Sequence, residues 1–294
     1  SVLALSIAAL FIYSSITLGR LVISPLHQIM ASMRKLRDGD LNTRLGFVDR
    51  NDEIGVLADT YNFMVQGLSE RERLKDAFNR YVSKQVYKRL EEGAITLTGE
   101  TREATILFSD IRSFTALSEQ LSPPDVVAML NEYFNEMVEI VFRYDGFLNK
   151  FIGDALMAVY NVPIEQTVPE LRAVRTALEM LDALHRLNGV RVSRGQFPLR
   201  IGIGINTGPV TAGNIGHMQR LEYTVIGDAV NLAQRVESQT KVTGSSLLIT
   251  ASTHAKIAPY VIAEALPAVK MKGKQEAVAL YAVSGLKPGA PPGR

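Results

Sequence analysis

The spacing of hydrophobic and polar residues changes several times along the chain, and the first stretch is almost entirely apolar. Residues 2–18 carry no charge and are mainly aliphatic, a length just short of the roughly 20 residues that span a bilayer. We interpret residues 1–19 as a transmembrane helix that lacks its N-terminal end, with a buried core helix as the alternative. Since the chain starts inside this span, we expect an upstream membrane or sensor segment to be missing.

Basic residues follow the apolar stretch within the short range that sets membrane orientation. They are Arg20, Arg34, Lys35 and Arg37. Positive charge of this kind is typical of the cytoplasmic side of a span. The pattern therefore predicts a protein of the cell membrane, in contact with lipid through its N-terminal helix, whose remaining residues lie in the cytoplasm.

Two stretches then repeat hydrophobic residues at intervals of three and four, which is the spacing of a coiled-coil seam. The first seam is Leu26, Ile29, Met33 and Leu36, and the second is Ile54, Leu57, Tyr61, Met64 and Leu68. Pro25 suits the first turn of the first helix. Two short helices joined by a polar connector cannot bury both seams alone. We therefore expect residues 20–71 to associate with a partner chain.

Residues 72–95 are predicted to form a helical linker whose register is ambiguous. Extending the upstream heptads places Arg71, Lys75, Phe78 and Val82 in the seam, whereas Leu74, Phe78, Tyr81 and Gln85 form a competing seam. Our hypothesis is that two registers of this linker correspond to two activity states. The alternative is a plain solvated helix.

Strands and helices alternate from residue 96 to residue 286, and a Pro/Gly-rich tail follows at 287–294. The predicted elements are a strand ending at Asp110, a helix between Pro124 and Val141, strands over 147–152 and 155–160, a helix over 169–187, paired strands over 199–206 and 208–215, and a helix over 228–240. This β-α-β-β-α-β order, with additions, predicts an α+β domain with ferredoxin-like topology.

Composition excludes several classes of function. The 294-residue chain is 47% hydrophobic and 21% charged with a net charge of +2, which is ordinary for a folded protein. It has no polybasic block with interleaved aromatic residues, so nucleic-acid binding is not expected. The absence of cysteine excludes disulfides, zinc–thiolate sites and thiol catalysis. Gly202 and Gly204 alternate within a strand pattern that no helix follows, so we interpret them as structural.

Candidate chemistry gathers at the ends of the predicted strands. Asp110 and Asp154 each stand at a strand end, and on neighbouring strands they would hold a pair of divalent cations against a polyphosphate. The alternative is that each aspartate only ends its strand. Asn231 and Arg235 are four residues apart and share one helix face. With the basic residues between Val269 and Lys274, the set indicates a nucleoside triphosphate site.

The region after the apolar helix resembles a HAMP signalling module. The resemblance covers residues 20–71 and rests on Pro25, on Gly39-Asp40-Leu41 in the connector, and on Asp52-Glu53-Ile54-Gly55 at the start of the second helix. It implies a parallel dimeric four-helix bundle that passes conformational signals from membrane to effector.

Residues 102–283 resemble the catalytic domain of class III nucleotide cyclases. The motifs FSDIRSFT, NKFIGDALMAVY, LRIGIGINTG, EYTVIGDAVNLAQRVES and VKMKGK stand in family order. The implied metal ligands are Asp110, Asp154 and the backbone near Ile111. The implied substrate contacts are Lys150 and Thr224 for adenine, Asn231 for the ribose, Arg235 for the transition state, and Arg200 and Lys272 for the triphosphate, with Lys274 as a rival to Lys272.

The resemblance implies an adenylyl cyclase that uses two Mg²⁺ or Mn²⁺ ions at the interface of a homodimer. Lys150 and Thr224 favour ATP, because guanylyl cyclases typically place Glu and Cys at these positions. Thr224, where many adenylyl cyclases carry Asp, resembles the subgroup that includes bicarbonate-responsive cyclases. The alternatives are a guanylyl or relaxed-specificity cyclase and a nucleotide-binding signalling module without turnover.

Overall fold

The computed structural model describes residues 2–81, 99–217, 220–271 and 276–291. The chain divides into two compact units, Ser1–Val82 and Ser83–Arg294. Each unit is described by itself below. The finer boundaries expected from the sequence stay predictions.

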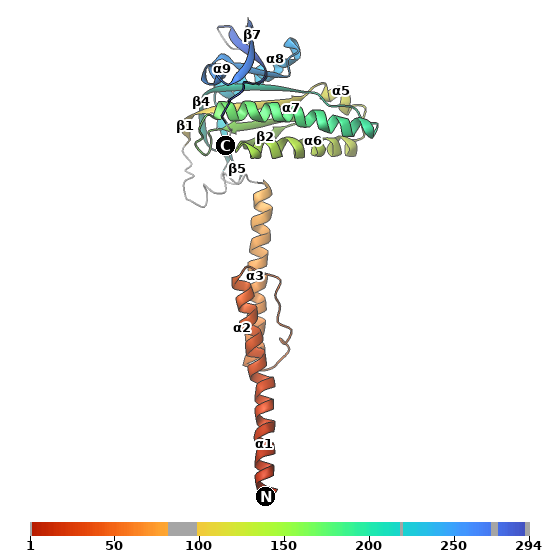
Figure 1. The fold of residues 1–294 in the computed structure, drawn as a ribbon, viewed down its shortest axis with the longest axis vertical. Helices are drawn as coiled ribbons and strands as arrows, with labels where there is room; N and C mark the ends of the chain where they lie inside the picture. Colours follow the sequence, from red (N-terminus) through yellow and green to blue (C-terminus); the bar gives the residue numbers. More distant parts are fainter. Residues whose placement is uncertain (1, 82–98, 218–219, 272–275, 292–294) are drawn as a thin grey trace. The chain divides into compact units, whose positions relative to one another are not determined.

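The first unit is helical (Figure 1). Its elements are α1 (Val2–Leu18), the π-helical turn η1 (Gly19–Ile23), α2 (Ser24–Arg37) and α3 (Glu53–Tyr81). Pro25 lies in the first turn of α2, as expected, where its missing N–H interrupts no hydrogen bond within that helix. The expected linker is helical as far as Tyr81, within α3, whereas Val82 and Gln85 of the competing seams lie outside the described residues.

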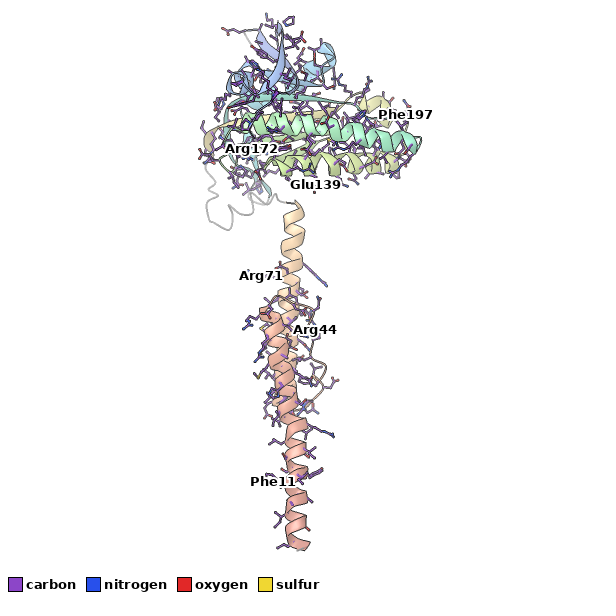
Figure 2. The ribbon with its side chains drawn as sticks, in the orientation of Figure 1. Phe11, Arg44, Arg71, Glu139, Arg172 and Phe197 are labelled. Carbon is purple, nitrogen blue, oxygen red and sulfur yellow. The ribbon has the colours of Figure 1, made fainter. Side chains whose placement is uncertain are left out.

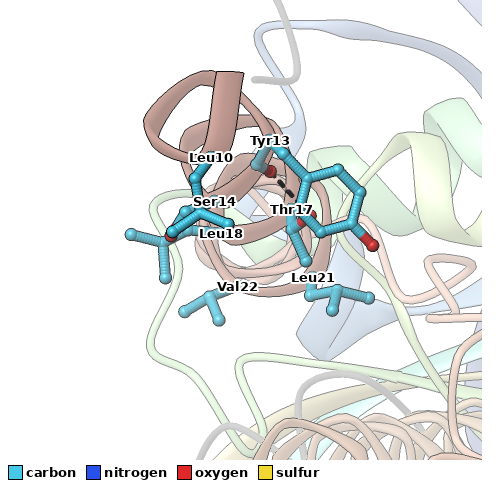
Figure 3. Close-up of a pocket in the computed structure, with 7 residues that line it drawn as sticks. All are labelled: Leu10, Tyr13, Ser14, Thr17, Leu18, Leu21 and Val22. Carbon is cyan, nitrogen blue, oxygen red and sulfur yellow. Dashed lines mark hydrogen bonds between the residues drawn. The ribbon is translucent and has the colours of Figure 1, made fainter. Parts of the chain in front are cut away.

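The first helical stretch is apolar and exposed. Ser6–Arg37 is long and apolar enough to cross a membrane, with a mean hydropathy of 1.7 in its most apolar window. Phe11 stands out from α1 and is 76% exposed (Figure 2). A groove runs beside α1 and η1, and the Thr17 hydroxyl next to it donates to the Tyr13 carbonyl at 2.8 Å (Figure 3). The hydroxyl is therefore satisfied within its own helix.

A small core joins α2, α3 and the connector between them. Its buried members are Ile29, Leu45, Ala58, Tyr61 and Val65. Asn62 fixes the connector by accepting from the Leu45 N–H and donating to the Leu45 carbonyl, both at 2.9 Å. Much of each predicted seam stays exposed within one chain, namely Leu26, Met33, Leu57, Met64 and Leu68. This exposure agrees with the expected partner chain, which stays a prediction.

The start of α3 is held by Asp52. Its carboxylate accepts the Gly55 N–H at 2.9 Å and pairs with Arg50, which also donates to the Leu21 carbonyl at 2.9 Å. The Arg50 hydrogen bond and the backbone N–H of Gly55 lower the pKa of Asp52 to about 2. The Asp-Glu-Ile-Gly motif therefore caps the helix and ties it back to η1.

The second unit is built on an eight-stranded sheet. Its strands are β1 (Glu100–Ile111), β2 (Phe147–Ile152), β3 (Ala155–Tyr160), β4 (Ile201–His217), β5 (Arg220–Ile226), β6 (Leu247–Thr250), β7 (Val261–Val269) and β8 (Val278–Leu286). Its helices are α5 (Phe114–Ser118), α6 (Pro123–Arg143), α7 (Pro169–Ser193), α8 (Asp228–Thr243) and α9 (Ala251–Ile257).

The strand order confirms the ferredoxin-like expectation. The strands run β2-β3-β1-β4-β6-β8-β7, and β5 pairs with β4 off this path. Within the first four, each strand is antiparallel to the next, whereas β4 is parallel to β6. Together with α6 and α7, which lie side by side (Figure 1), they form the predicted β-α-β-β-α-β unit.

One strand prediction was wrong. Residues 199–206 and 208–215 do not pair around a glycine turn but belong to the single 17-residue strand β4. β1 pairs with β4 in unbroken register from Glu100↔Ala212 to Ile111↔Ile201, so the long partner keeps Gly208 and Pro209 extended. The hairpin partner of β4 is β5, which pairs from Thr211↔Ile226 onward.

The two faces of β4 carry different kinds of residue because side chains alternate along a strand. Ile201, Ile203 and Ile205 join the core beneath α6 and α7. Gly202 and Gly204 face α8 instead, where an added Cβ on Gly204 would overlap the backbone nitrogen of Glu237. These glycines are therefore structural, as expected, and let α8 lie directly on the sheet.

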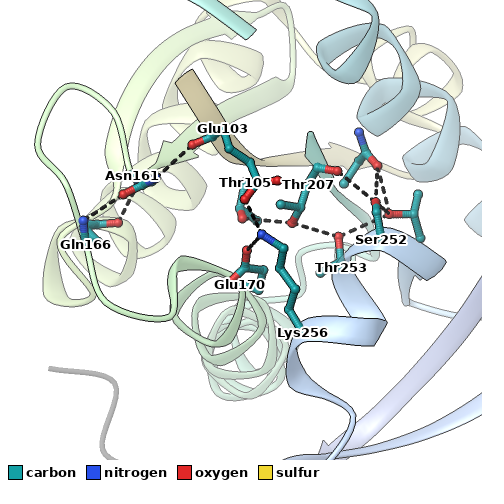
Figure 4. A network of polar contacts seen from close by, with 11 residues as sticks. Glu103, Thr105, Asn161, Gln166, Glu170, Thr207, Ser252, Thr253 and Lys256 are labelled. Carbon is teal, nitrogen blue, oxygen red and sulfur yellow. Dashed lines mark hydrogen bonds and ion pairs between the residues drawn. The ribbon is translucent and has the colours of Figure 1, made fainter. Parts of the chain in front are cut away.

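A buried chain of hydroxyls leads from the sheet to α8. Thr207 bonds Thr105 at 2.9 Å and Thr253 at 3.1 Å (Figure 4). Thr253 lies 3.2 Å from Thr250, which donates to Asn206 at 2.8 Å. Asn206 in turn donates to the Ala229 carbonyl at 2.9 Å. The first turn of α8 is thereby fixed on β4.

We predict that Gly204→Ala destabilises the second unit by about 3 kcal/mol, because the new methyl group overlaps the α8 backbone. The matched control is Gly189→Ala in α7, where a Cβ would meet nothing within 4 Å. This control should leave the free energy of unfolding unchanged or raise it by about 0.5–1 kcal/mol. Differential scanning calorimetry of the two variants checks the difference, and equal melting temperatures would contradict it.

Candidate active site

Asp110 and Asp154 meet at the ends of two neighbouring strands. β1 and β3 are antiparallel partners with Ser109 opposite Leu156, and each aspartate lies just beyond that pair. Gly153, at a φ of 65°, makes the tight turn between β2 and β3 that presents Asp154. A cleft of about 260 Å³ opens there. Its lining residues are Phe108, Asp110, Ile152, Asp154, Ala155, Gln234, Glu237 and Ser238.

The position of Asp154 changes the pKa of its carboxyl group. Burial, and then the hydrogen bond and charge of Asp110, raise the pKa of Asp154 to about 6. The backbone N–H of Ile111 acts in the opposite direction by bonding the ionised carboxylate. Among the described residues, the buried Oδ2 of Asp154 has no hydrogen-bond partner. A buried oxygen without a partner beside a second carboxylate is suited to a cation.

The donor set fits a hard divalent cation. It offers two carboxylates and nearby backbone, and oxygen donors of this kind are preferred by Mg²⁺ and Mn²⁺. No cluster of three or more His, Cys, Asp or Glu able to hold a metal occurs in the described part of the chain. The two aspartates would therefore leave coordination positions open for phosphate oxygens and water.

The helix α8 brings two charged side chains to this cleft that sequence reasoning missed. Lys241 Nζ lies 3.0 Å from Asp110 Oδ2, and Asp110 raises the pKa of Lys241. Glu237 is only 4% exposed, and burial followed by the charge of Asp110 raises its pKa to about 7. The four-residue spacing of Glu237 and Lys241 was the available signal, since it places them on one helix face.

Side-chain contacts join β2 and β5 at Lys150 and Thr224. The partners in these contacts, Glu222 and Asn149, were not predicted from the sequence. The Thr224 hydroxyl donates to Asn149 Oδ1 at 3.0 Å. Lys150 Nζ lies 3.1 Å from Glu222 Oε2, and this pair is largely exposed. Glu222 and Thr224 alternate along β5 and so share one face, which was the signal for their common role.

Asn231 and Arg235 lie on α8, one turn apart. Asn231 is exposed, whereas Arg235 is partly buried and its Nη1 has no hydrogen-bond partner among the described residues. A guanidinium nitrogen in this condition is suited to an anion. Arg200 is exposed just before β4, and its carbonyl accepts the Arg112 N–H at 2.7 Å near the end of β1. Lys272 and Lys274 lie outside the described residues.

The predicted site residues therefore form separate groups within one chain. Asp110 and Asp154 line the cleft, and Arg200 lies at the same end of β1 and β4. The lining of that cleft, over the described residues, includes none of Lys150, Thr224, Asn231 and Arg235. A single chain thus presents two sets of site residues. The cleft contains the two aspartates together with residues of α8 but, among its described lining residues, none of Lys150, Thr224, Asn231 and Arg235.

Family models match most of the chain. Residues 97–285 match the model described as the adenylate and guanylate cyclase catalytic domain, and residues 17–70 match the HAMP domain. An adenylate cyclase of Anabaena cylindrica is 35% identical over 88% of this chain and 54% of its own length. Adenylate cyclase 1 of Rhizobium meliloti is 34% identical over 92% of this chain and 40% of its own length. The chain thus spans about half the length of these relatives.

Solved cyclase structures resemble the second unit. The adenylyl cyclase CyaB from P. aeruginosa has a TM-score of 0.61 and 34% identity, over 65% of this chain and 98% of that one. The guanylyl cyclase Cya2 has a TM-score of 0.62 and 36% identity, over 65% of this chain and 96% of that one. Because the chain is similar to both kinds of cyclase, the choice between adenine and guanine must be argued from its own residues.

The pKa of Asp154 predicts a pH-dependent stability in the absence of divalent cations. Folding raises this pKa from 3.8 to about 6, so the folded state binds more protons between these values. The free energy of unfolding therefore falls as the pH rises through this window. Asp154→Asn removes the titration, and its stability in EDTA should fall less than that of the wild type. We expect a difference of about 1 kcal/mol, allowing for solvent screening.

Calorimetry from about pH 4 to about pH 6 measures this difference. Carboxyl groups remote from Asp154 titrate equally in both proteins, so only the difference between the two stability curves is informative. Parallel stability curves would contradict the raised pKa of Asp154.

Proposed function

The chain belongs to the adenylate and guanylate cyclase family and carries a HAMP domain, and we propose from this that it converts ATP to 3′,5′-cyclic AMP and pyrophosphate. The observation that carries the proposal is the pairing of Asp110 with Asp154 in one cleft. Lys150 on β2 and Thr224 on β5 supply the second argument, because side-chain contacts join these two strands at both residues and the pair fits adenine.

In the proposed reaction, Asp110 and Asp154 bind the metal ions. They would hold two Mg²⁺ or Mn²⁺ ions, with the backbone near Ile111 contributing to the same site. Such ions lower the pKa of a bound hydroxyl and stabilise charge on phosphate oxygens. The carboxylates fix where the 3′-hydroxyl and the α-phosphate of ATP meet for in-line attack, after which pyrophosphate leaves.

Cationic and amide side chains act on the substrate directly. Asn231 orients the ribose, and Arg235 offsets the charge that develops on the α-phosphate. The unpartnered Nη1 of Arg235 supports this assignment, since that N–H is not committed to another group among the described residues. Arg200 and Lys272 contact the triphosphate, with Lys274 as the rival of Lys272. These are electrostatic roles, in which one oriented donor contributes on the order of 10²-fold in rate.

Hydrogen bonding at Thr224 supports adenine rather than guanine. Because the Thr224 hydroxyl gives its proton to Asn149, its oxygen can act towards a base only as an acceptor. The adenine amino group is a donor and matches an acceptor, whereas guanine presents a carbonyl at the same ring position. Lys150 donates to a ring nitrogen, once released from the exposed Glu222 pair. Such exposed pairs contribute little, so releasing Lys150 costs about 1 kcal/mol or less.

The separation of the two groups supports a homodimer with shared sites. Asp110, Asp154 and Arg200 of one chain would face Lys150, Thr224, Asn231, Arg235 and Lys272 of the other. Two equivalent sites follow from twofold symmetry. The exposed seam residues of α2 and α3 would meet in the same dimer and bring the catalytic units together.

In our proposal the enzyme lies at the cell membrane with its catalytic unit in the cytoplasm. The apolar window of Ser6–Arg37 supports an anchor in lipid, and the HAMP domain supports regulation by a signal that arrives along the helices. Two registers of the linker would correspond to two activity states. Bicarbonate sensitivity is a further expectation, from the threonine at position 224.

A guanylyl or relaxed-specificity cyclase is the second candidate. The observation that favours it is the 36% identity with a guanylyl cyclase of known structure. A nucleotide-binding signalling module without turnover is the third. It is less consistent with the arrangement, since Asp110, Asp154, Asn231 and Arg235 are all present.

Product analysis separates these candidates. The membrane-embedded chain is given ATP or GTP with Mg²⁺ or Mn²⁺, and cyclic products are quantified. We expect cyclic AMP, with ATP preferred by on the order of 10²-fold. Asp154→Ala should abolish turnover, and Arg235→Ala should lower it on the order of 10²-fold. A preference for GTP would contradict the base assignment, and no cyclic nucleotide with either metal would contradict a cyclase activity of this chain.

A further inference from the structure

α8 carries charged residues on two different faces. Asn231 and Arg235 share one face, while Glu237 and Lys241 share another that meets the carboxylate cleft. The first pair has a role in the proposed reaction. The second pair has none, although it contributes two of the charges closest to Asp110.

Negative charge is concentrated at this end of the sheet. Asp110, Asp154 and Glu237 all line one cleft of about 260 Å³. Arg112 is nearby, but its Nη2 is committed to the carbonyls of Thr240 at 3.1 Å and Ser245 at 2.7 Å. Among the described residues, Lys241 is the cation that forms an ion pair with a carboxylate of the cleft.

The two partners of this ion pair differ in their freedom to move. Asp110 stands near the end of β1, opposite Gly202 of β4 and directly after the last residue that β1 pairs with β3, and its side chain is 22% exposed. Lys241 lies in the last turn of α8 on a long flexible stem, and its side chain is 49% exposed. The ammonium can therefore leave Asp110 for solvent without disturbing the helix, whereas Asp110 cannot follow it.

We propose that Lys241 is a built-in competitor for the divalent cation, which neutralises Asp110 until a metal ion displaces it. The inference rests on the proposed metal role of Asp110 and Asp154. It makes Lys241 a positioning residue that sets metal affinity rather than a group that touches the substrate.

The test measures metal binding without turnover. The full chain in lipid nanodiscs is titrated with Mn²⁺ in the absence of nucleotide, and free Mn²⁺ is quantified by electron paramagnetic resonance. Lys241→Gln should bind Mn²⁺ about tenfold more tightly than the wild type, because a positive charge next to a ligand is gone. Lys241→Arg keeps the charge and should remain within about twofold of the wild type.

Two controls make the result specific. Lys287→Gln removes the same charge from an exposed lysine whose Nζ donates to the Ala258 carbonyl, and it should leave the affinity unchanged. Asp154→Asn should abolish the Mn²⁺ binding whose affinity Lys241→Gln is expected to raise. Circular dichroism confirms that each variant is folded before titration.

The outcomes distinguish this inference from the proposed function. Unchanged or weaker Mn²⁺ binding by folded Lys241→Gln, in a chain that makes cyclic AMP, overturns the inference alone. No Asp154-dependent binding in the wild type overturns both the inference and the proposed metal role. Tighter binding by Lys241→Gln in a chain that makes no cyclic nucleotide supports the inference and overturns the proposed function.

Discussion

The repulsion between Asp110 and Asp154 is the constraint around which the catalytic unit is arranged. Burial and the neighbouring carboxylate raise the pKa of Asp154 to about 6, so a nearby cation would favour the state in which both groups are ionised. The fold keeps them together nonetheless. β1 is paired on both sides, and the Gly153 turn fixes where Asp154 stands. A rigid pair of carboxylates of this kind would need no reorganisation to bind the divalent cations that we propose.

The close approach of α8 to β4 connects this cation site to the rest of the chemistry. Gly204 admits the helix backbone, and Asn206 holds its first turn through the Ala229 carbonyl. One face of α8 then meets the cleft through Glu237 and Lys241, and another presents Asn231 and Arg235. In the proposed dimer each α8 would belong to two active sites. A change in the relative position of the catalytic units would therefore act on both sites together.

The sequence predicted those features that local pattern determines. The β2-β3 hairpin was predicted correctly because Gly153 separates two apolar runs, and Gly202 and Gly204 were correctly taken as structural. The division of β4 was wrong because Gly208-Pro209 is a local turn signal that pairing with β1 overrides. Glu237 and Lys241 were missed because charges on a helix usually indicate a solvated face. Asn231 and Arg235 were assigned through family resemblance, since their spacing alone indicates only a shared face.

The central claim is that each active site needs two chains, and heterodimers test it most directly. Differently tagged Asp110→Ala and Asn231→Ala chains are co-expressed, and dimers carrying both tags are isolated before cyclic AMP production is measured. The homodimer of either variant should be inactive. The heterodimer keeps one intact site out of two, so it should show about half the wild-type activity. A verified heterodimer as inactive as its parents would contradict the shared site.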